Sequence, residues 1–199
     1  MLEEFALFAG LLNERLLDGA HMSEDDVRYS FYLAAVQRGS IYHSDLSLEH
    51  PHPAIPHAHI DTLIHGDTSP RGTAIEFKYD RSNPGGTNQN RTQRAGSFLA
   101  DLFRLGLIPD ELAMEKFFVY LTDQGMASYF LNPSNDLSRL YNIEPGDEFH
   151  LGPNQVSQLA SSAVRRVEDL IHPCTIVGYY RNDLGLDHQL RIFQVFEAA

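Results

Sequence analysis

Asp61, Glu76 and Lys78 are the residues whose types and spacing best suit chemistry. Glu76 and Lys78 lie two residues apart in TAIEFKYD, so on a strand their side chains share a face, and Asp61 interrupts the apolar stretch HIDTLI. Charged side chains that point together from neighbouring strands are costly to bury without compensation. Two carboxylates suit Mg²⁺, with Mn²⁺ as a substitute, and a lysine beside them can position or deprotonate water or stabilise charge on a phosphate. The three residues therefore predict metal-assisted hydrolysis of phosphodiester bonds.

Other interpretations of this region stay open. The strand could lie at the surface with a solvated Glu76–Lys78 pair, because acidic residues are common in this chain. Alternatively, His57, His59, Asp61 and His65 share one predicted strand face, and the first three could hold Zn²⁺ in a small zinc-dependent hydrolase. His-x-His-x-Asp resembles part of the metal motif of metallo-β-lactamase-like hydrolases, but Thr62 stands where that motif has a histidine. The stretch HPHPAIPHAH could instead be an exposed loop, with His59 as a phosphate contact.

The distribution of charge bears on nucleic-acid binding. The formal net charge of −12 excludes a uniformly basic coat and a polybasic membrane anchor. Between Arg71 and Arg104, however, six basic residues outnumber three acidic ones, so this segment carries +3 and the rest of the chain −15. Because arginine binds phosphate bidentately, Arg81, Arg91 and Arg94 are predicted to contact a phosphate backbone. The alternative is that Arg91, Arg94 and Arg104 form surface ion pairs with acidic residues, which contribute little.

The elements that must position these residues follow from periodicity, caps and turns. Ser23 is predicted to cap a helix with three acidic residues in its first turn, and the prolines of 50–56 predict a loop. The predicted helices span 2–17, 24–37, 91–105 and 155–171, and the predicted strands span 40–48, 57–64, 73–79, 117–121, 175–180 and 189–196. The two last strands form a hairpin across the turn 181–187. This order predicts one α/β domain over 1–199, a mixed sheet flanked by helices.

The order of the elements and the charged residues resembles the core of the PD-(D/E)XK, or restriction-endonuclease-like, nuclease superfamily. The matching positions are Asp61, Glu76 and Lys78, in HIDTLI and AIEFKYD, and the resemblance covers about residues 23–122. Ile60 stands where the family name expects proline. The resemblance implies a restriction-endonuclease-like core with an added N-terminal helix and C-terminal hairpin.

Two predicted helices carry further matches to this superfamily. SEDDVRYSF resembles the first core helix, whose glutamate completes the metal site; Glu24 fits that role, with Asp25 or Asp26 as substitutes. TQRAGSFLADLFRL resembles the helix after the acidic motif, where a glutamine or basic residue often assists. The residues for that role are Arg91, Gln93 and Arg94.

The resemblance implies Mg²⁺-dependent cleavage of DNA, in restriction, repair or phage defence. Asp61 and Glu76 would hold the metal with the Phe77 carbonyl, Lys78 would activate water, and Glu24 would bind or orient a second metal. The superfamily also contains members that no longer cleave, so a non-catalytic DNA-binding or assembly subunit stays an alternative. A homodimer is a further expectation, with the apolar first helix as its surface, as is membership of a larger restriction or repair complex.

The remaining features concern compartment. The chain has one cysteine, Cys174, which cannot form an internal disulfide. The N-terminus MLEEFALFAG has glutamates where a signal peptide needs positive charge, and its apolar stretch is far shorter than a membrane span. We therefore expect a cytoplasmic protein without a membrane partner.

Overall fold

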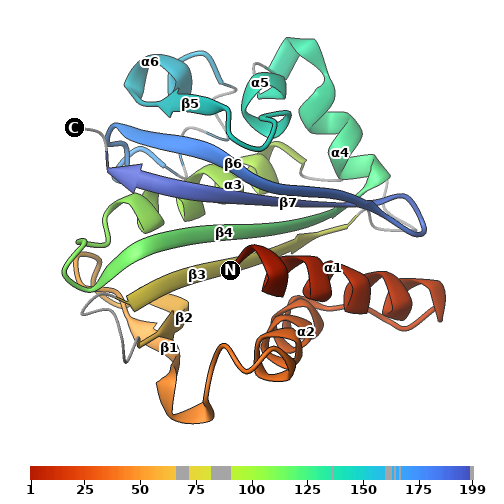
Figure 1. Cartoon of the computed structure of the whole chain (residues 1–199). Helices are drawn as coiled ribbons and strands as arrows, with labels where there is room; N and C mark the ends of the chain where they lie inside the picture. Colours follow the sequence, from red (N-terminus) through yellow and green to blue (C-terminus); the bar gives the residue numbers. More distant parts are fainter. Residues whose placement is uncertain are drawn as a thin grey trace.

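A seven-stranded mixed sheet forms the centre of the computed structural model, which describes residues 1–65, 72–81, 91–135, 137–159, 163, 165 and 167–197 (Figure 1). The strands are β1 (Leu46–Pro51), β2 (His59–Ile64), β3 (Gly72–Asp80), β4 (Ala113–Asp123), β5 (Glu148–Leu151), β6 (Cys174–Leu184) and β7 (His188–Glu197). They lie in the order β1-β2-β3-β4-β7-β6-β5; β3 and β4 are parallel, and the other neighbours are antiparallel. The predicted α/β class with a mixed sheet flanked by helices is confirmed.

Helices cover both faces of this sheet (Figure 1). Helices α1 (Leu2–Leu17) and α2 (Glu24–Gln37) pack on one face, and α3 (Arg91–Gly106) packs on the other. The shorter elements are η1 (His43–Asp45), α4 (Gln124–Leu131), η2 (Pro133–Asn135), α5 (Ser138–Tyr141) and α6 (Pro153–Val156). The helices thus divide the apolar interior into two cores, one on each face of the sheet.

Strand β3 contributes to both cores by alternation, as its sequence predicts. Ala74 is buried in the core beneath α3, whereas Ile75 and Phe77 are buried in the core beneath α1 and α2. Phe31 of α2 packs on Phe77 with ring centroids 5.5 Å apart, which fixes α2 against β3. Because side chains alternate, Glu76 and Lys78 point toward α3, and both line a pocket that α3 helps to form.

The start of α2 is set by its cap. The Ser23 hydroxyl accepts a hydrogen bond from the Asp26 amide, and the Asp26 carboxylate accepts one from the Ser23 amide, a complete capping box. The cap predicted at Ser23 is therefore confirmed. It places Glu24 in the first helical turn, next to the carboxyl-terminal half of β3.

Helix α1 belongs to the core. Its apolar residues Phe5, Phe8, Leu12 and Leu16 are buried against the sheet and α2. Of the two roles open to this apolar face, core or dimer surface, the structure shows the core, and the homodimer stays a prediction. Within the described parts of the chain, no helix is long and apolar enough to cross a membrane.

Two predicted boundaries around the first strands are wrong for local reasons. The strand predicted over 40–48 begins only with β1, because the Asp45 carboxylate accepts the Tyr42 amide and closes a turn. At its other end β1 continues to Pro51, which an edge strand tolerates. Strand β2 begins at His59 rather than at His57, whose φ of 65° lies outside the strand region.

The C-terminal half departs further from the predictions. Of the helix predicted over 155–171, 155–156 belong to the short α6, which ends before Ser157, whose hydroxyl donates to the Asn154 carbonyl, and Ala163 is helical. Residues 157–158 and 167–170 form turns, and 160–162, 164 and 166 lie outside the described residues. The hairpin turn is only 185–187, because 181–184 pair with β7. Helices α4 and α5 and strand β5 were not predicted.

Strand β2 accompanies β3 for only part of its length. The two strands pair from Thr62 with Ile75 to Ile64 with Thr73, and beyond Thr62 the start of β2 pairs only with β1. The second half of β3 therefore has β4 on one side and no strand on the other. This opened edge of β3 faces the N-terminal turn of α2 and positions the candidate site.

Candidate active site

Two carboxylates occupy the opened edge of β3. The Asp61 carboxylate accepts a hydrogen bond from the Phe77 amide at 2.8 Å, and the Glu24 carboxylate accepts one from the Tyr79 amide at 3.3 Å. Alternate amides of a strand point to the same edge, so these side chains replace the hydrogen bonds that a neighbouring strand would supply. The divergence of β2 thus brings carboxylates from β2 and α2 to one strand edge.

A pocket of about 330 Å³ lies at this edge, and we call it the carboxylate pocket. Its lining residues are Glu24, Asp61, Glu76, Phe77, Lys78, Ser97, Ala100, Asp101, Arg104 and Leu170. The five residues predicted for the metal and catalytic site, Glu24, Asp61, Glu76, Phe77 and Lys78, are all among them. The structure therefore brings these residues together from α2, β2 and β3.

Glu76 is the most enclosed of the predicted metal ligands. Only 3% of its surface is exposed. Its Oε2 accepts a hydrogen bond from Arg104 Nη2 at 3.2 Å, whereas its Oε1 is buried without a hydrogen-bond partner among the described residues. Burial, and then the negative charge of Asp61, raise the pKa of Glu76 well above its usual value. An unsatisfied buried carboxylate oxygen is costly and marks a place where a cation would be stabilised.

Asp61 is held between the sheet and an arginine. Its Oδ1 lies 3.0 Å from Arg28 Nη2, and its Oδ2 is the acceptor for the Phe77 amide. Burial raises the pKa of Asp61, although the Phe77 amide and Arg28 oppose this effect. Arg28 also lies 2.8 Å from Glu49 and 3.8 Å from Glu24, so one guanidinium links several carboxylates.

Lys78 lies between two carboxylates. Its Nζ is 3.9 Å from Glu24 and 4.0 Å from Asp101. Burial lowers the pKa of Lys78, but the negative charges of Asp101 and Glu24 outweigh burial and raise it above its usual value. The ammonium therefore stays protonated, which favours a role in stabilising negative charge over the predicted role as a base that activates water.

Arg28, Asp101 and Arg104 complete the cluster, and none of them was predicted for the site from the sequence. Asp101 is 5% exposed and lies 2.8 Å from Arg104. Burial raises the pKa of Asp101 to about 6, although Arg104 and Lys78 oppose this effect. One signal was present in the sequence: Asp101 and Arg104 are charged residues three apart within the apolar face of a predicted helix.

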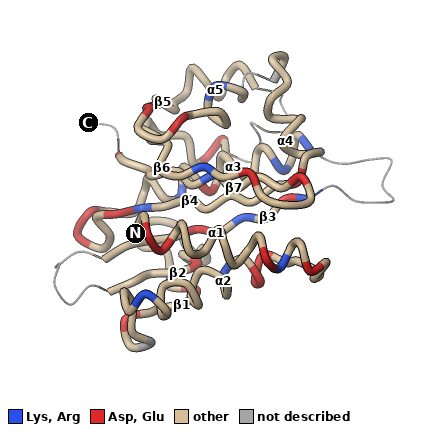
Figure 2. Tube along the Cα trace, turned by 45° about the vertical axis from the view of Figure 1, so that its right-hand side comes forward, with Lys and Arg blue, Asp and Glu red and all other residues tan. Residues whose placement is uncertain are grey.

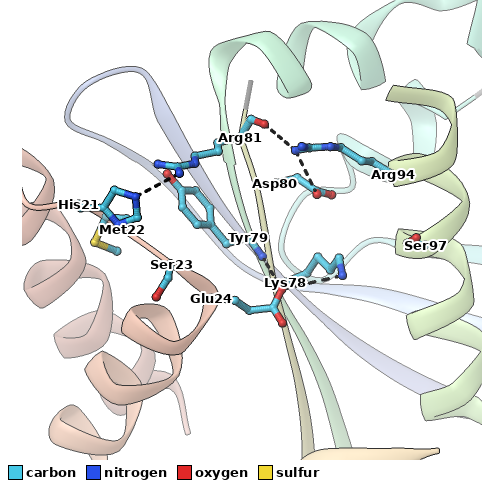
Figure 3. Close-up of a pocket in the computed structure, with 10 residues that line it drawn as sticks. All are labelled: His21, Met22, Ser23, Glu24, Lys78, Tyr79, Asp80, Arg81, Arg94 and Ser97. Carbon is cyan, nitrogen blue, oxygen red and sulfur yellow. Dashed lines mark hydrogen bonds and ion pairs between the residues drawn. The ribbon is translucent and has the colours of Figure 1, made fainter. Parts of the chain in front are cut away.

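A second pocket, of about 370 Å³, adjoins the first; we call it the arginine pocket. Its lining residues are His21, Met22, Ser23, Glu24, Lys78, Tyr79, Asp80, Arg81, Arg94 and Ser97 (Figure 3). Arg94 approaches from α3 and donates hydrogen bonds to the Arg81 carbonyl at 2.5 Å and to Asp80 at 3.5 Å. Arg81 Nη2 lies 3.2 Å from His21 Nε2 across the pocket.

Asp80 holds Arg94 through a hydrogen bond and an ion pair. It is 5% exposed and also accepts a hydrogen bond from the buried Tyr120 hydroxyl at 3.0 Å. Burial raises the pKa of Asp80, but Lys78, Tyr120 and Arg94 all favour its ionised form. The position of Arg94 is thus fixed from the core of the protein.

Other predicted residues lie outside both pockets. Gln93 is exposed on α3, and neither Gln93 nor Arg91 lines either pocket. Asp26 is committed to the helix cap and to Arg15, and Asp25 is exposed, so Glu24 is the acidic residue of this turn that reaches β3. Arg71 lies outside the described residues.

The predicted basic segment does not form a simple basic face. Lys78, Arg94 and Arg104 each lie beside a carboxylate, and acidic and basic positions are interleaved around β3, α2 and α3 (Figure 2). Arg94 and Arg104 are therefore ion-paired, as the alternative predicts, but their partners Asp80 and Glu76 are buried, so these are not surface pairs. The excess of basic residues is concentrated in the arginine pocket.

The histidines do not assemble the alternative zinc site. His57 precedes β2 with a φ of 65°, so it does not continue the strand face that His59 shares with Asp61, and both histidines are exposed. His52, by contrast, is buried: its Nε2 bonds to the Arg104 carbonyl, and its Nδ1 accepts the amides of Ala54 and Ile55. Among the described residues, no group of three His, Cys, Asp or Glu side chains is arranged to hold a metal ion unaided.

The donors in the carboxylate pocket nevertheless fit a magnesium ion better than a zinc ion. Asp61 and Glu76 supply oxygen atoms only, and Glu76 Oε1 is a buried acceptor without a partner among the residues described. Mg²⁺ accepts one or two carboxylates and keeps several waters, so it does not need a closed set of protein ligands. The chemistry of these donors would suit a hydrated divalent cation, and the guanidinium groups of the arginine pocket would suit an anion.

Comparisons of the chain with protein-family models, with curated proteins and with solved structures give no match.

Proposed function

We propose that this protein is a Mg²⁺-dependent nuclease that hydrolyses phosphodiester bonds in DNA, with a core of the restriction-endonuclease-like type. The observation that carries the proposal is the position of Glu76 Oε1. Within the described part of the chain this oxygen is buried without a partner, in a pocket that also contains Asp61 and Lys78. Asp61, Glu76 and the Phe77 carbonyl would hold the ion, and a divalent cation bound there polarises a phosphate and lowers the pKa of its water.

The chain's own residues prepare the substrate for the reaction. The reaction adds water across one ester bond: the water oxygen bonds to phosphorus, the bond to the sugar oxygen breaks, and that oxygen takes a proton. The Lys78 ammonium, oriented by Glu24 and Asp101, stabilises the negative charge that develops on the phosphate. In this role, the raised pKa of Lys78 is an advantage because the charge must persist.

The arginine pocket supports a polyanionic substrate. It adjoins the carboxylate pocket through Glu24, Lys78 and Ser97, which line both. We assign Arg81 and Arg94 to a phosphate next to the one that is cleaved, because guanidinium groups bind phosphate oxygens bidentately. This assignment also supports DNA binding by an acidic protein, since the rest of the chain repels the backbone and affinity depends on this local charge.

A second candidate function is a non-catalytic DNA-binding or assembly subunit. One observation favours it: Arg28 and Arg104 already neutralise Asp61 and Glu76 in this structure. In a non-catalytic protein these ion pairs would be permanent and would replace the metal. The homodimer and the larger restriction or repair complex stay predictions under both functions.

Cleavage of plasmid and linear DNA with Mg²⁺ or Mn²⁺ tests the proposal. We expect nicking or linearisation by the natural chain, and a loss of about 10²-fold to 10³-fold in Lys78→Met. Arg139→Met, which removes a cation from α5, is the matched control because it lies outside both pockets. Equal rates for the natural chain and Lys78→Met would overturn the mechanism, and tight DNA binding without any cleavage would establish the non-catalytic alternative.

A further inference from the structure

Arg104 and Glu76 form an incomplete ion pair. A single nitrogen, Arg104 Nη2, contacts both Glu76 Oε2 at 3.2 Å and Asp101 Oδ1 at 2.8 Å. Among the described residues, neither the buried Nε of Arg104 nor the buried Oε1 of Glu76 has a hydrogen-bond partner. The pair therefore leaves one buried donor and one buried acceptor unsatisfied in the same pocket, which is costly for both groups.

The two unsatisfied atoms call for partners of opposite charge. A carboxylate oxygen is satisfied by a cation, and the Nε and Nη2 nitrogens of arginine together form the fork that binds two oxygens of a phosphate. No single ion can satisfy both atoms, but a divalent cation together with a phosphate can. Arg104 lines the carboxylate pocket and 28% of its side chain is exposed, so a guanidinium that turns toward the pocket, with its buried Nε, meets such a phosphate.

We propose that Arg104 neutralises Glu76 in the metal-free protein. When a divalent cation binds Glu76, Arg104 releases Glu76 and binds the phosphate that is cleaved. This inference rests on the proposed function and adds a residue to it. Asp101 holds Arg104 while the partner of Arg104 changes, because Asp101 makes the shorter of the two contacts and lies on the same helix. Arg104 is then a catalytic residue that contacts the substrate, and Asp101 is a positioning residue that acts through Arg104.

The exchange makes the two ligands interdependent. Without DNA, the cation competes with Arg104 for Glu76, which weakens metal binding. With DNA, the guanidinium has a new partner, so the cation meets no competitor. The protein therefore binds metal and phosphate cooperatively, without any large rearrangement of the fold.

Metal binding by the full chain, measured without DNA, tests this role. By titration calorimetry we expect Arg104→Met to bind Mn²⁺ about fivefold more tightly than the natural chain, because the competing cation is gone. The same variant should bind an uncleaved duplex in Ca²⁺ about tenfold more weakly. Arg139→Met, the matched control, should change neither constant by more than about twofold.

The outcomes separate this inference from the proposed function. If the natural chain binds Mn²⁺ and Arg104→Met binds it equally or more weakly, the role of Arg104 is wrong and the metal site stands. If neither protein binds Mn²⁺ and the natural chain does not cleave DNA, the proposed function fails and this inference fails with it.

A measurement on the natural chain covers the case in which Arg104→Met does not fold. We expect the ¹⁵Nε resonance of Arg104 to shift when Mg²⁺ is added, and to shift again when a duplex is added, because its partner changes each time. The resonance of Arg139 serves as the internal control. An Arg104 resonance that does not respond to Mg²⁺ would overturn the inference.

Discussion

The carboxylate pocket and the arginine pocket share a wall but differ in charge and in burial. Four acidic and two basic residues line the first, whereas three basic and two acidic residues line the second. The first is built from buried groups such as Glu76 and Asp101, whereas Arg81 is exposed and Arg94 is half-buried. Buried carboxylates suit a small cation held in one place, and exposed guanidinium groups suit a mobile polyanion. The difference predicts that chemistry and affinity can be removed separately.

The largest effect is expected from Glu76→Gln, which should abolish chemistry in the carboxylate pocket. We expect cleavage to fall by about 10³-fold because the amide is a poor metal ligand. Duplex affinity in Ca²⁺, measured by fluorescence anisotropy, should change far less than the rate. If the glutamine variant kept more than about a tenth of the natural rate, Glu76 would not be a metal ligand.

The double substitution Arg81→Ala and Arg94→Ala should have the opposite profile. We expect duplex affinity to fall about 10-fold to 100-fold and the slope of log affinity against log salt to decrease by about two, one for each phosphate that no longer meets a guanidinium group. In cleavage assays, the double substitution should raise KM more than it lowers kcat. An unchanged salt slope would show that the arginine pocket does not bind phosphate, and Arg139→Ala again provides the control.

A third expectation concerns pH and sharpens the comparison. The pKa of Asp101 is raised to about 6, and burial also raises the pKa values of Glu76, Asp61 and Glu24. A cation must displace the protons that its ligands Glu76 and Asp61 hold, so Mn²⁺ affinity should rise with pH, by about tenfold per unit for each proton released. Calorimetry in buffers of different ionisation enthalpy counts those protons. Affinity that is independent of pH between about 5.5 and about 7.5 would contradict the assigned environment.

The smallest effect is on stability without metal. A carboxyl whose pKa is raised on folding binds more protons in the native state, so the free energy of unfolding falls as pH rises from about 4 to about 6. Asp101→Asn removes this cost, and we expect it to stabilise the metal-free protein by about 1 kcal/mol at a pH of about 7.5. The gain should be smaller at a pH of about 4.5, where Asp101 is protonated in the native state and only its unfolded-state carboxyl is ionised. Urea denaturation at both pH values checks this, and a variant that is destabilised at the higher pH contradicts it.

The sequence was sufficient for features that depend on nearest neighbours. The Ser23 cap, the alternation of β3 and the grouping of Asp61, Glu76 and Lys78 all follow from local rules of capping and of strand geometry. The acidic residue of α2 that reaches β3 was also predicted as Glu24, with its neighbours as substitutes.

The ion pairs that give the site its charge balance were not predictable in this way. Arg28 meets Asp61 across 33 residues of sequence, and Arg104 meets Glu76 across 28, so both pairs depend on how helices pack on the sheet. Histidine spacing was misleading for a similar reason: the prediction assumed that His57 continues the strand, whereas its backbone leaves the strand region. The short C-terminal elements carry too few periodic residues for a prediction from pattern.

The hydrogen bond from the Phe77 amide to the Asp61 carboxylate ties the proposed chemistry to the integrity of the sheet. A chain that replaced Asp61 with an apolar residue would lose a metal ligand and would also leave a strand amide without an acceptor at an opened edge. A substitution of Asp61 that removed the proposed activity would therefore also lower the stability of the fold. In a related chain without the proposed activity, we expect either an aspartate or asparagine kept at this position for structural reasons, or a β2 that closes against β3 along its whole length.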